Sequence, residues 1–276
     1  MRAGLFILAL MILTVLFGPM ALPEPDALDL GARFAEPSWE HLLGTDELGR
    51  DLAARLLQGG RVSLTVAAVT AVLAALIGTL VGMVAGYHGG FLDAALMRLT
   101  DGVMALPLLP LLIVLAAADP AKLGIDADMA GSEGFAVARL AVIIACVGWT
   151  TVARLVRGST LSVRSRDYVR AAVAAGATPS RIMLRHILPN VASPMVVATT
   201  LSVGNIILIE SALSFLGLGI RPPLASWGNM LTGAMDVVWS APALAVWPGA
   251  AILVAVLAFN LVGDGLQKAL DPKSST

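Results

Sequence analysis

The chain has 276 residues, of which 58% are hydrophobic and 13% are charged. Soluble domains carry about 25% charged residues, so most of this chain is expected to lie in lipid or against other lipid-embedded helices. The net charge of −1 provides no overall basic field, which argues against a nucleic-acid partner. Cys146 is the one cysteine in the sequence, which excludes an intrachain disulfide and favours a packing role.

Six apolar stretches are long enough, or nearly so, to cross a bilayer core of about 30 Å as helices of roughly 20 residues. Strand-like alternation is absent, and backbone polar groups in lipid must pair within their own segment. The sequence therefore predicts an all-α polytopic membrane protein with one transmembrane domain over residues 1–276. The expected spans are 3–22, 62–86, 94–118, 135–156, 191–216 and 242–264.

The first stretch has two interpretations. Arg2 followed by an apolar run is typical of a retained helix but also of a signal peptide. The retained helix is preferred, because Pro19, Met20 and Ala21 make a poor cleavage site. Either interpretation leaves residue 23 on the outer side of the membrane.

The charges of the loops predict the orientation of the chain. Loop 157–190 holds six arginines against one acid, whereas segment 23–61 holds eight acids against four arginines. Cytoplasmic loops carry an excess of Lys and Arg, so loop 157–190 is expected in the cytoplasm and segment 23–61 in the periplasm. Six spans then place both termini in the cytoplasm, and Lys268 and Lys273 agree with this.

The second, fourth and fifth stretches are rich in Ala, Gly, Ser, Thr and Val. Small side chains let helix backbones approach closely in lipid, where no hydrophobic effect draws helices together. This composition predicts close packing within the chain and against partner subunits.

Loop 157–190 is predicted to form a helical hairpin. Asp167 can cap a helix that runs to Ala175, and Gly176 can end this helix in the left-handed conformation.

A second helix is expected to follow directly. Thr178 offers a new N-cap and Pro179 occupies the first helical position. This helix is predicted to run to about Leu188 and to stop at Pro189.

The residues of the hairpin leave two alternatives open. Ala171 and Ala172 are small enough for close docking into a groove on another protein. The arginines equally suit a basic hairpin lying on anionic lipid.

A resemblance favours the first alternative. The run from Arg170 through Ala171, Ala172 and Gly176 to Pro189 resembles the "EAA" loop of permease subunits in binding-protein-dependent ABC importers. In that family the loop forms a coupling helix on the ATPase subunits, and the family's usual Glu is Arg170 here. The resemblance implies ATPase contacts at Arg170, Ala171, Ala172, Gly176, Ala177, Pro179, Arg181 and Arg185.

Three further motifs narrow the resemblance to the C-type permease subunit of the dipeptide, oligopeptide and nickel importers. They occur in the right order between the spans, and the match runs from about residue 40 to 272. It implies the type I ABC importer permease fold with a cytoplasmic coupling-helix hairpin, in a bacterial inner membrane. The motifs are GTDELGRD at 44–51, ESALSFLGLG at 210–219 followed by SWG at 226–228, and NLVGDGL at 260–266 followed by DP at 271–272.

The resemblance also implies the partners and the solute. The partners are a second homologous permease, two ATPase subunits, an extracytoplasmic solute-binding protein and membrane lipid. No phosphate-binding Gly-Lys-Ser/Thr loop is present, so ATP and Mg²⁺ are expected on the ATPase subunits, with no cofactor and no catalysis in this chain. Peptides are the expected solute, and nickel is the alternative.

Glu210 is the most unusual polar residue of the predicted spans, because a carboxylate in an apolar helix is costly unless it is paired or hydrated. It is either a pathway or subunit-interface residue, or a helix-end residue with local hydrogen bonds. Ser202 and Asn205 follow the same helical stripe, which favours a lined cavity.

Two smaller expectations concern charged and metal-ligating residues. Arg98 and Asp101, three residues apart, are expected to form a local ion pair. His41, His88 and His186 share no helical face, so no metal site is expected.

Two other classes of function fit less well. An intramembrane protease requires a Gly-x-Ser nucleophile or paired aspartates in its spans, and this chain has neither pattern. A secondary transporter requires charged residues at the midplane of broken helices, and Glu210 is the one candidate.

Overall fold

The computed structural model describes residues 1–270, so the motif at 271–272 and Lys273 lie outside the described residues. Within that range the chain is helical, and its one bridge of β type joins Thr45 to Asp51. The long helices are α1 (Arg2–Phe17), α2 (Leu52–His88), α3 (Gly90–Ala105), α6 (Glu133–Arg164), α9 (Leu188–Phe215) and α11 (Ala243–Leu270). The shorter elements are η1 (Gly18–Ala21), η2 (Leu30–Ala32), α4 (Leu108–Ala116), η3 (Pro120–Leu123), α5 (Ala127–Ala130), α7 (Asp167–Ala174), α8 (Pro179–Ile182), η4 (Met183–Ile187) and α10 (Trp227–Met235).

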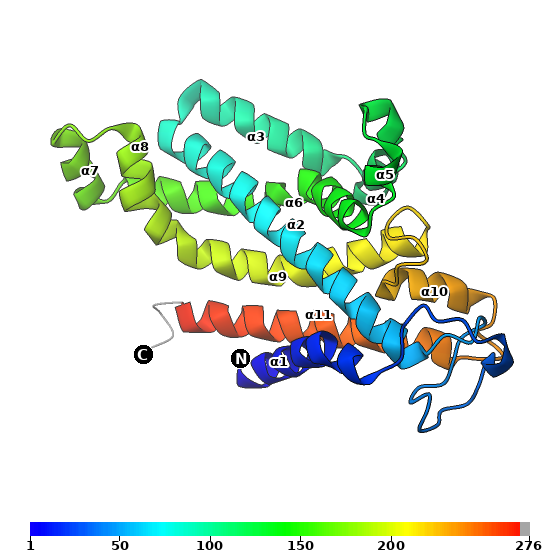
Figure 1. The fold of residues 1–276 in the computed structure, drawn as a ribbon. Helices are drawn as coiled ribbons and strands as arrows, with labels where there is room; N and C mark the ends of the chain where they lie inside the picture. The colour runs from blue at the N-terminus through cyan, green and yellow to red at the C-terminus, as the bar shows by residue number, and fades with distance from the viewer. Residues whose placement is uncertain (271–276) are drawn as a thin grey trace.

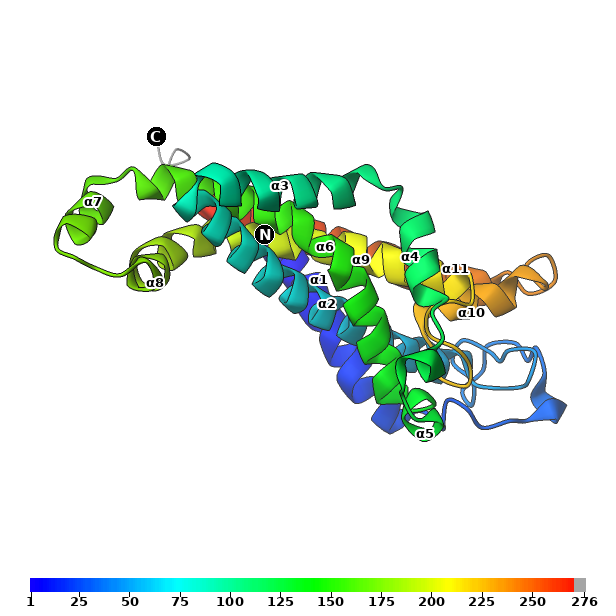
Figure 2. The same ribbon diagram turned by 90° about the horizontal axis from the view of Figure 1, so that it is seen from above.

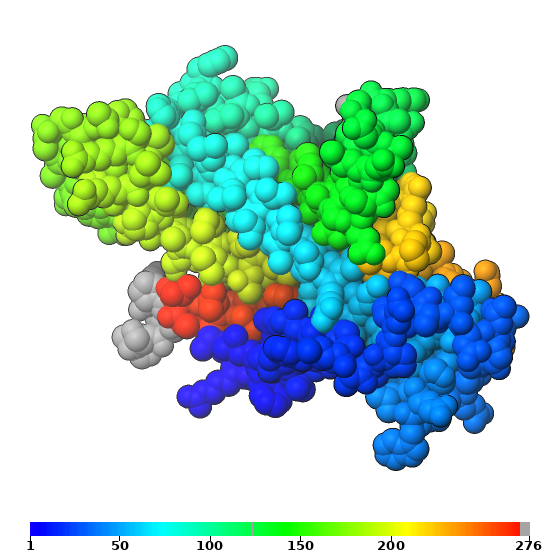
Figure 3. All heavy atoms as spheres, viewed as in Figure 1, coloured from blue at the N-terminus to red at the C-terminus, as the bar shows by residue number. Residues whose placement is uncertain are grey.

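The helices form an elongated bundle with two different ends (Figures 1 and 2). The hairpin of α7 and α8 projects at one end, and Figure 3 shows it as a separate lobe. Segment 22–51 and α10 lie at the opposite end. The beginning of α1 packs beside the last turns of α11, where Met1 lies against Gly265. Both termini of the described chain therefore lie toward the hairpin end.

The predicted all-α membrane fold is confirmed, with one irregular span. Among the described residues, five helices are long and apolar enough to cross a membrane, and the bent pair of α3 and α4 makes a sixth if it counts as one span. The pair bends by 90° at Leu106 and Pro107. Proline has no backbone N–H and disfavours the helical conformation of the residue before it, and Leu106 is accordingly extended.

Helix α2 begins at Leu52, well before the predicted residue 62. Asp51 caps it, accepting a hydrogen bond from the Ala54 N–H at 2.7 Å. The arginines of its first turns are paired inside the protein: Arg55 contacts Asp26 at 2.8 Å, and Arg61 donates to the Val15 carbonyl at 2.8 Å. The arginines made this segment look like a loop in the sequence. In the structure their partners on other segments allow it to be helical.

The most extensive helix–helix contact joins α2 to α6. Gly78, Gly82 and Gly86, spaced four residues apart, form one stripe of α2 that lies directly on α6. A Cβ atom at Gly78 would lie 2.6 Å from the Trp149 carbonyl oxygen, and one at Gly86 would lie 2.8 Å from the Thr160 Cβ. This agrees with the expectation that small residues bring helices together in lipid.

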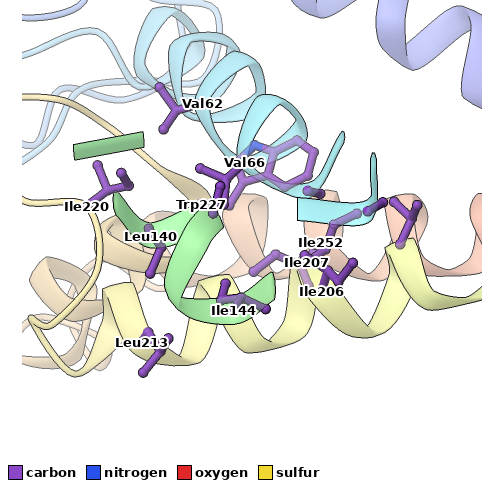
Figure 4. Packing of buried hydrophobic residues seen from close by; sticks show 14 of the residues in the cluster. Val62, Val66, Leu140, Ile144, Ile206, Ile207, Leu213, Ile220, Trp227 and Ile252 are labelled. Carbon is purple, nitrogen blue, oxygen red and sulfur yellow. The ribbon is translucent and has the colours of Figure 1, made fainter. Parts of the chain in front are cut away.

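The main apolar core lies where α2, α6, α9 and α11 meet toward the α10 end of the bundle. Figure 4 shows Val66, Ile144, Ile207 and Ile252 converging from these four helices. Trp227, at the start of α10, completes the cluster.

Replacing Gly82 with leucine should prevent α2 and α6 from approaching. A Cβ there would lie 2.9 Å from the Arg157 backbone nitrogen, so a larger side chain should cost about 1–3 kcal/mol through overpacking. Gly158→Leu is the matched control, because nothing lies within 4 Å of a Cβ at Gly158. The measurement is the folded fraction after detergent extraction and gel filtration. Equal yields of the two variants would contradict a packing role for the stripe.

Candidate functional site

The first helix of the hairpin ends in a fully formed capping motif. Gly176 has φ +79°, as the sequence predicts. The Ala177 N–H donates to the Ala172 carbonyl at 3.1 Å, and the Gly176 N–H donates to the Val173 carbonyl at 3.0 Å. These two bonds define a Schellman turn, which fixes the angle at which the chain leaves α7.

The start of this helix differs from the prediction. The N-cap is Arg166 and makes no side-chain bond, so capping by Asp167 is wrong. Asp167 is instead the first helical residue, where a negative charge still interacts favourably with the helix dipole. The helix ends at Ala174, and Ala175 is its C-cap.

The second helix begins as predicted but does not stop at Pro189. Thr178 accepts a hydrogen bond from the Arg181 N–H at 3.4 Å, and Pro179 follows it. After α8 the backbone widens into the π-helical turn η4, in which the Leu188 N–H bonds to the Met183 carbonyl. A wider turn accommodates the proline ring and its missing N–H. The predicted stop is therefore wrong, and Pro179–Phe215 is one continuous helical segment.

Apolar side chains fix the base of the hairpin to the bundle. Val169 of α7 and Ile182 of α8 are each 1% exposed. They join an apolar cluster with Met83 of α2 and with Val152 and Val156 of α6. The sequence analysis missed this anchor, although Val169 and Ile182 are apolar positions between arginines.

Of the predicted ATPase-contacting residues, Ala177 packs against this apolar cluster, and the other seven are not part of it. Ala172 and Ala177 are half-buried. The other six are exposed: Arg170, Ala171, Gly176, Pro179, Arg181 and Arg185.

A large cavity opens between the α3–α4 bend, α6, α9 and the end of α11. Its volume is about 770 Å³, and its wall is mainly apolar. Ser202 and Asn205 of α9 both line it, together with Thr150, Thr151 and Gln267. The Ser202 hydroxyl is already bonded to the Thr199 carbonyl at 2.7 Å, whereas Asn205 is exposed.

Glu210 does not line this cavity. Its side chain is fully buried, and its carboxyl group is surrounded by serine hydroxyls. Ser214 donates to it at 2.8 Å and Ser211 at 3.4 Å. The hydroxyls of Ser63 on α2 and Ser226 before α10 also interact with it. The structure thus separates Glu210 from Ser202 and Asn205.

Trp227 attaches α10 to α2 beside this carboxyl group. Its backbone N–H donates to Ser63 Oγ at 3.2 Å, and its indole N–H donates to the Leu56 carbonyl at 3.0 Å. A Cβ at Gly228 would lie 2.6 Å from the Ser211 Cα, so a larger residue has no room there. The SWG motif therefore closes one end of the bundle.

The GTDELGRD motif folds around Asp46. This carboxylate accepts the Leu48 N–H at 2.9 Å, the Arg50 N–H at 3.0 Å and the Arg50 Nε at 2.7 Å. Arg55 approaches the same carboxylate at 3.6 Å. The motif lines a cavity of about 260 Å³ opposite residues 214–234, so two motifs far apart in the sequence meet here.

Two ion pairs join α3 to α6. Asp101 pairs with Arg154 at 2.5 Å, so the expected pairing with Arg98 is wrong. Asp93 accepts two bonds from Arg157, at 2.5 and 2.7 Å. Both aspartates of α3 therefore pair with an arginine of the neighbouring helix α6 and not with one of their own helix.

The described residues hold no group of three His, Cys, Asp or Glu side chains placed to bind a metal ion.

A family model described as "Binding-protein-dependent transport system inner membrane component" matches residues 78–276. This chain belongs to that family. It is an ABC transporter permease, and it functions as the multi-pass membrane component of a transporter complex.

Its relatives cover nearly the whole chain. It is 41% identical over 274 residues to a protein of Brucella suis described as a peptide permease, covering 98% of this chain and 86% of the relative. It is 37% identical over 272 residues to the nickel transport system permease protein NikC of Escherichia coli K12, covering 98% and 93%.

Solved structures support the fold. The MetNI methionine ABC transporter in an inward-facing conformation matches with a TM-score of 0.61 at 18% identity, covering 78% of this chain and 96% of that chain. An amino acid ABC transporter matches with a TM-score of 0.56 at 14% identity, covering 78% and 94%. The predicted type I permease fold is thereby confirmed.

Two substitutions of Glu210 should separate the hydrogen bonds that its carboxyl group accepts from the volume that its side chain fills. Glu210→Ala removes the shared acceptor of four hydroxyls and leaves a cavity, which should cost about 2–4 kcal/mol. Glu210→Gln keeps the volume and one acceptor oxygen, so it should be milder. Thermal unfolding of the purified subunit in detergent and uptake in cells are the two measurements. Equal, wild-type behaviour of both variants would exclude Glu210 from the functional residues.

Proposed function

We propose that this chain forms half of the translocation pathway of an ATP-driven peptide importer. The cavity beside α9 is the observation that carries the proposal. Its wall, among the described residues, contains no charged side chain and offers hydroxyl and amide groups on an apolar surface. Such a wall suits the amide backbone and varied side chains of a peptide.

Nickel is the second candidate solute, because a nickel permease is among the relatives. A nickel ion prefers imidazole, carboxylate or thiolate ligands. The cavity wall offers none of these in the described part of the chain, so a nickel pathway would depend on the partner proteins for its ligands.

The complex is proposed to contain a second homologous permease, two ATPase subunits and an extracytoplasmic solute-binding protein. ATP and Mg²⁺ are bound by the ATPase subunits, and no cofactor is held by this chain. The exposed face of the hairpin supports contact with the ATPases through Ala171, Pro179 and Arg181. Movement of α8 passes directly into α9, because the two form one continuous helical segment.

The solute is tested by reconstituting the complete complex in liposomes. Labelled di- and oligopeptides should accumulate only with the binding protein and ATP. Nickel uptake should remain at the level measured without ATP. ATP-dependent accumulation of nickel with no uptake of peptides would reverse the assignment.

The orientation is proposed from the loop charges, with the hairpin and both termini in the cytoplasm. Ser180 on α8 and Ser38 in the outer segment are both exposed and suit labelling as cysteines. In a Cys146→Ala background, an impermeant thiol reagent applied to spheroplasts should modify Ser38→Cys but not Ser180→Cys. The reverse pattern would invert the proposed topology.

Coupling is tested at Gly176. Nothing lies within 4 Å of a Cβ at this position, so a substitution there strains only the backbone. Gly176→Val should misplace α7 and lower uptake severely, because β-branched residues strongly disfavour positive φ. Gly176→Asn is the matched control, since asparagine tolerates this conformation. ATPase stimulation and uptake are measured together in proteoliposomes. If Gly176→Val keeps wild-type ATPase stimulation and uptake, another element must provide the coupling.

A further inference from the structure

A second open cavity lies at the hairpin end of the bundle. Its volume is about 690 Å³, and it is bounded by the last turns of α2, the last turns of α6 and by α7. It shares no lining residue with the cavity proposed for the solute. Its polar wall is formed by His88, Arg164, Ser165 and Arg170.

The charge of this wall is uncompensated. Among the described residues, neither Arg164 nor Arg170 forms an ion pair, and no acidic side chain lines the cavity. The nearby Arg157 is different, because Asp93 neutralises it through two hydrogen bonds. Two guanidinium groups are thus available to an anionic ligand.

Arg164 is oriented toward this space by its neighbours. Its guanidinium carbon lies 5.9 Å from the centre of the Tyr87 ring, a distance typical of a cation–π contact. Gly89 has φ +70° and lies beside the guanidinium, where a Cβ would be 3.4 Å from Arg164 Nη1. The glycine connection between α2 and α3 therefore packs beside the guanidinium without displacing it.

The flanks of the cavity are apolar. Leu161 and Val173 line it and are 39% and 54% exposed. Tyr87 lies at the end of the candidate membrane span α2. Tyrosine is enriched at this position because helix ends lie at the lipid–water boundary.

We propose that this cavity binds the phosphate headgroup of an anionic phospholipid. Arg164 and Arg170 contact the phosphate, and the acyl chains lie along the exposed side chains of Leu161 and Val173. Basic cavities between transmembrane helices bind phospholipid headgroups in this way. A free phosphate would use the same arginines, but it would make no use of Leu161 or Val173.

This site joins the lipid to the hairpin. Arg164 belongs to α6, whereas Arg170 belongs to α7, so one phosphate bridges a membrane span and the predicted coupling helix. The inference goes beyond the proposed transport function and does not depend on which solute is carried.

The test measures lipid retention on the purified complete complex. The complex is delipidated, supplied with equal amounts of phosphatidylglycerol and phosphatidylcholine, and analysed by native mass spectrometry. The wild type should retain phosphatidylglycerol preferentially. Arg164→Gln should lower this retention about fivefold, the effect of one basic residue near an anionic membrane surface.

Two matched variants distinguish a site from a general charge effect. Arg164→Lys keeps the positive charge and should retain phosphatidylglycerol close to the wild-type level. Arg166→Gln removes an exposed arginine that does not line the cavity and should leave retention unchanged.

Three results would overturn the proposal. The first is unchanged retention in Arg164→Gln, and the second is an equal loss in Arg166→Gln. The third is full displacement of phosphatidylglycerol by excess inorganic phosphate, which would identify free phosphate as the ligand. The expected result is that phosphate alone does not displace the lipid.

Discussion

The close approach of α2 and α6 positions most of the other elements. In lipid the apolar surfaces of helices gain little by meeting, so association depends on tight packing and on polar contacts. The stripe of Gly78, Gly82 and Gly86 provides the tight packing. Because the two backbones meet along this length, their last turns form a common floor for α7 and α8. The same approach presents Arg154 and Arg157 of α6 to the aspartates of α3.

The two ends of the bundle are held by different kinds of interaction. At the α10 end, the bonds around Glu210, Trp227 and Asp46 are directional and fix one register. At the other end, the α7–α8 hairpin is attached to the bundle by apolar contacts of Val169 and Ile182, which are non-directional. Directional bonds resist sliding more than apolar contacts do, so movement of the hairpin against the bundle is favoured. This is the end at which the predicted ATPase contacts lie.

Local chemistry predicted much of the structure, and tertiary contacts account for the rest. Apolar length predicted the spans, and the preferences of Gly176 and Thr178 predicted the turn of the hairpin, because each of these signals lies within a few residues. The start of α2 was missed because Arg61 finds its partner on α1. Pro107 bends a span, whereas Pro189 is accommodated by a π-helical turn, and the local sequence does not distinguish these outcomes.

The site residues also divide into those that the sequence predicted and those that tertiary contacts decide. The resemblance predicted which positions of the hairpin contact other subunits, and six of those eight positions are exposed. Those roles stay predictions. Helical spacing grouped Glu210 with Ser202 and Asn205, but the structure puts Glu210 behind the cavity wall. The position of the α10 segment decides this, and no periodicity within α9 encodes it.

A buried carboxyl group is a costly way to hold helices together, so its presence requires a reason beyond stability. An apolar residue at position 210 would pack without desolvating a carboxyl group, and replacing buried polar groups in this way is often neutral or stabilising. Apolar contacts, however, would not distinguish one register of α9 from the next. The carboxyl group meets Ser214 on its own helix, Ser63 on α2 and Ser226 before α10, and these hydroxyls converge only in one arrangement. Glu210 therefore fixes the end of α9 farthest from the hairpin. In the proposed coupling route, a force applied through α8 would tilt α9 about this point and move the wall that carries Ser202 and Asn205.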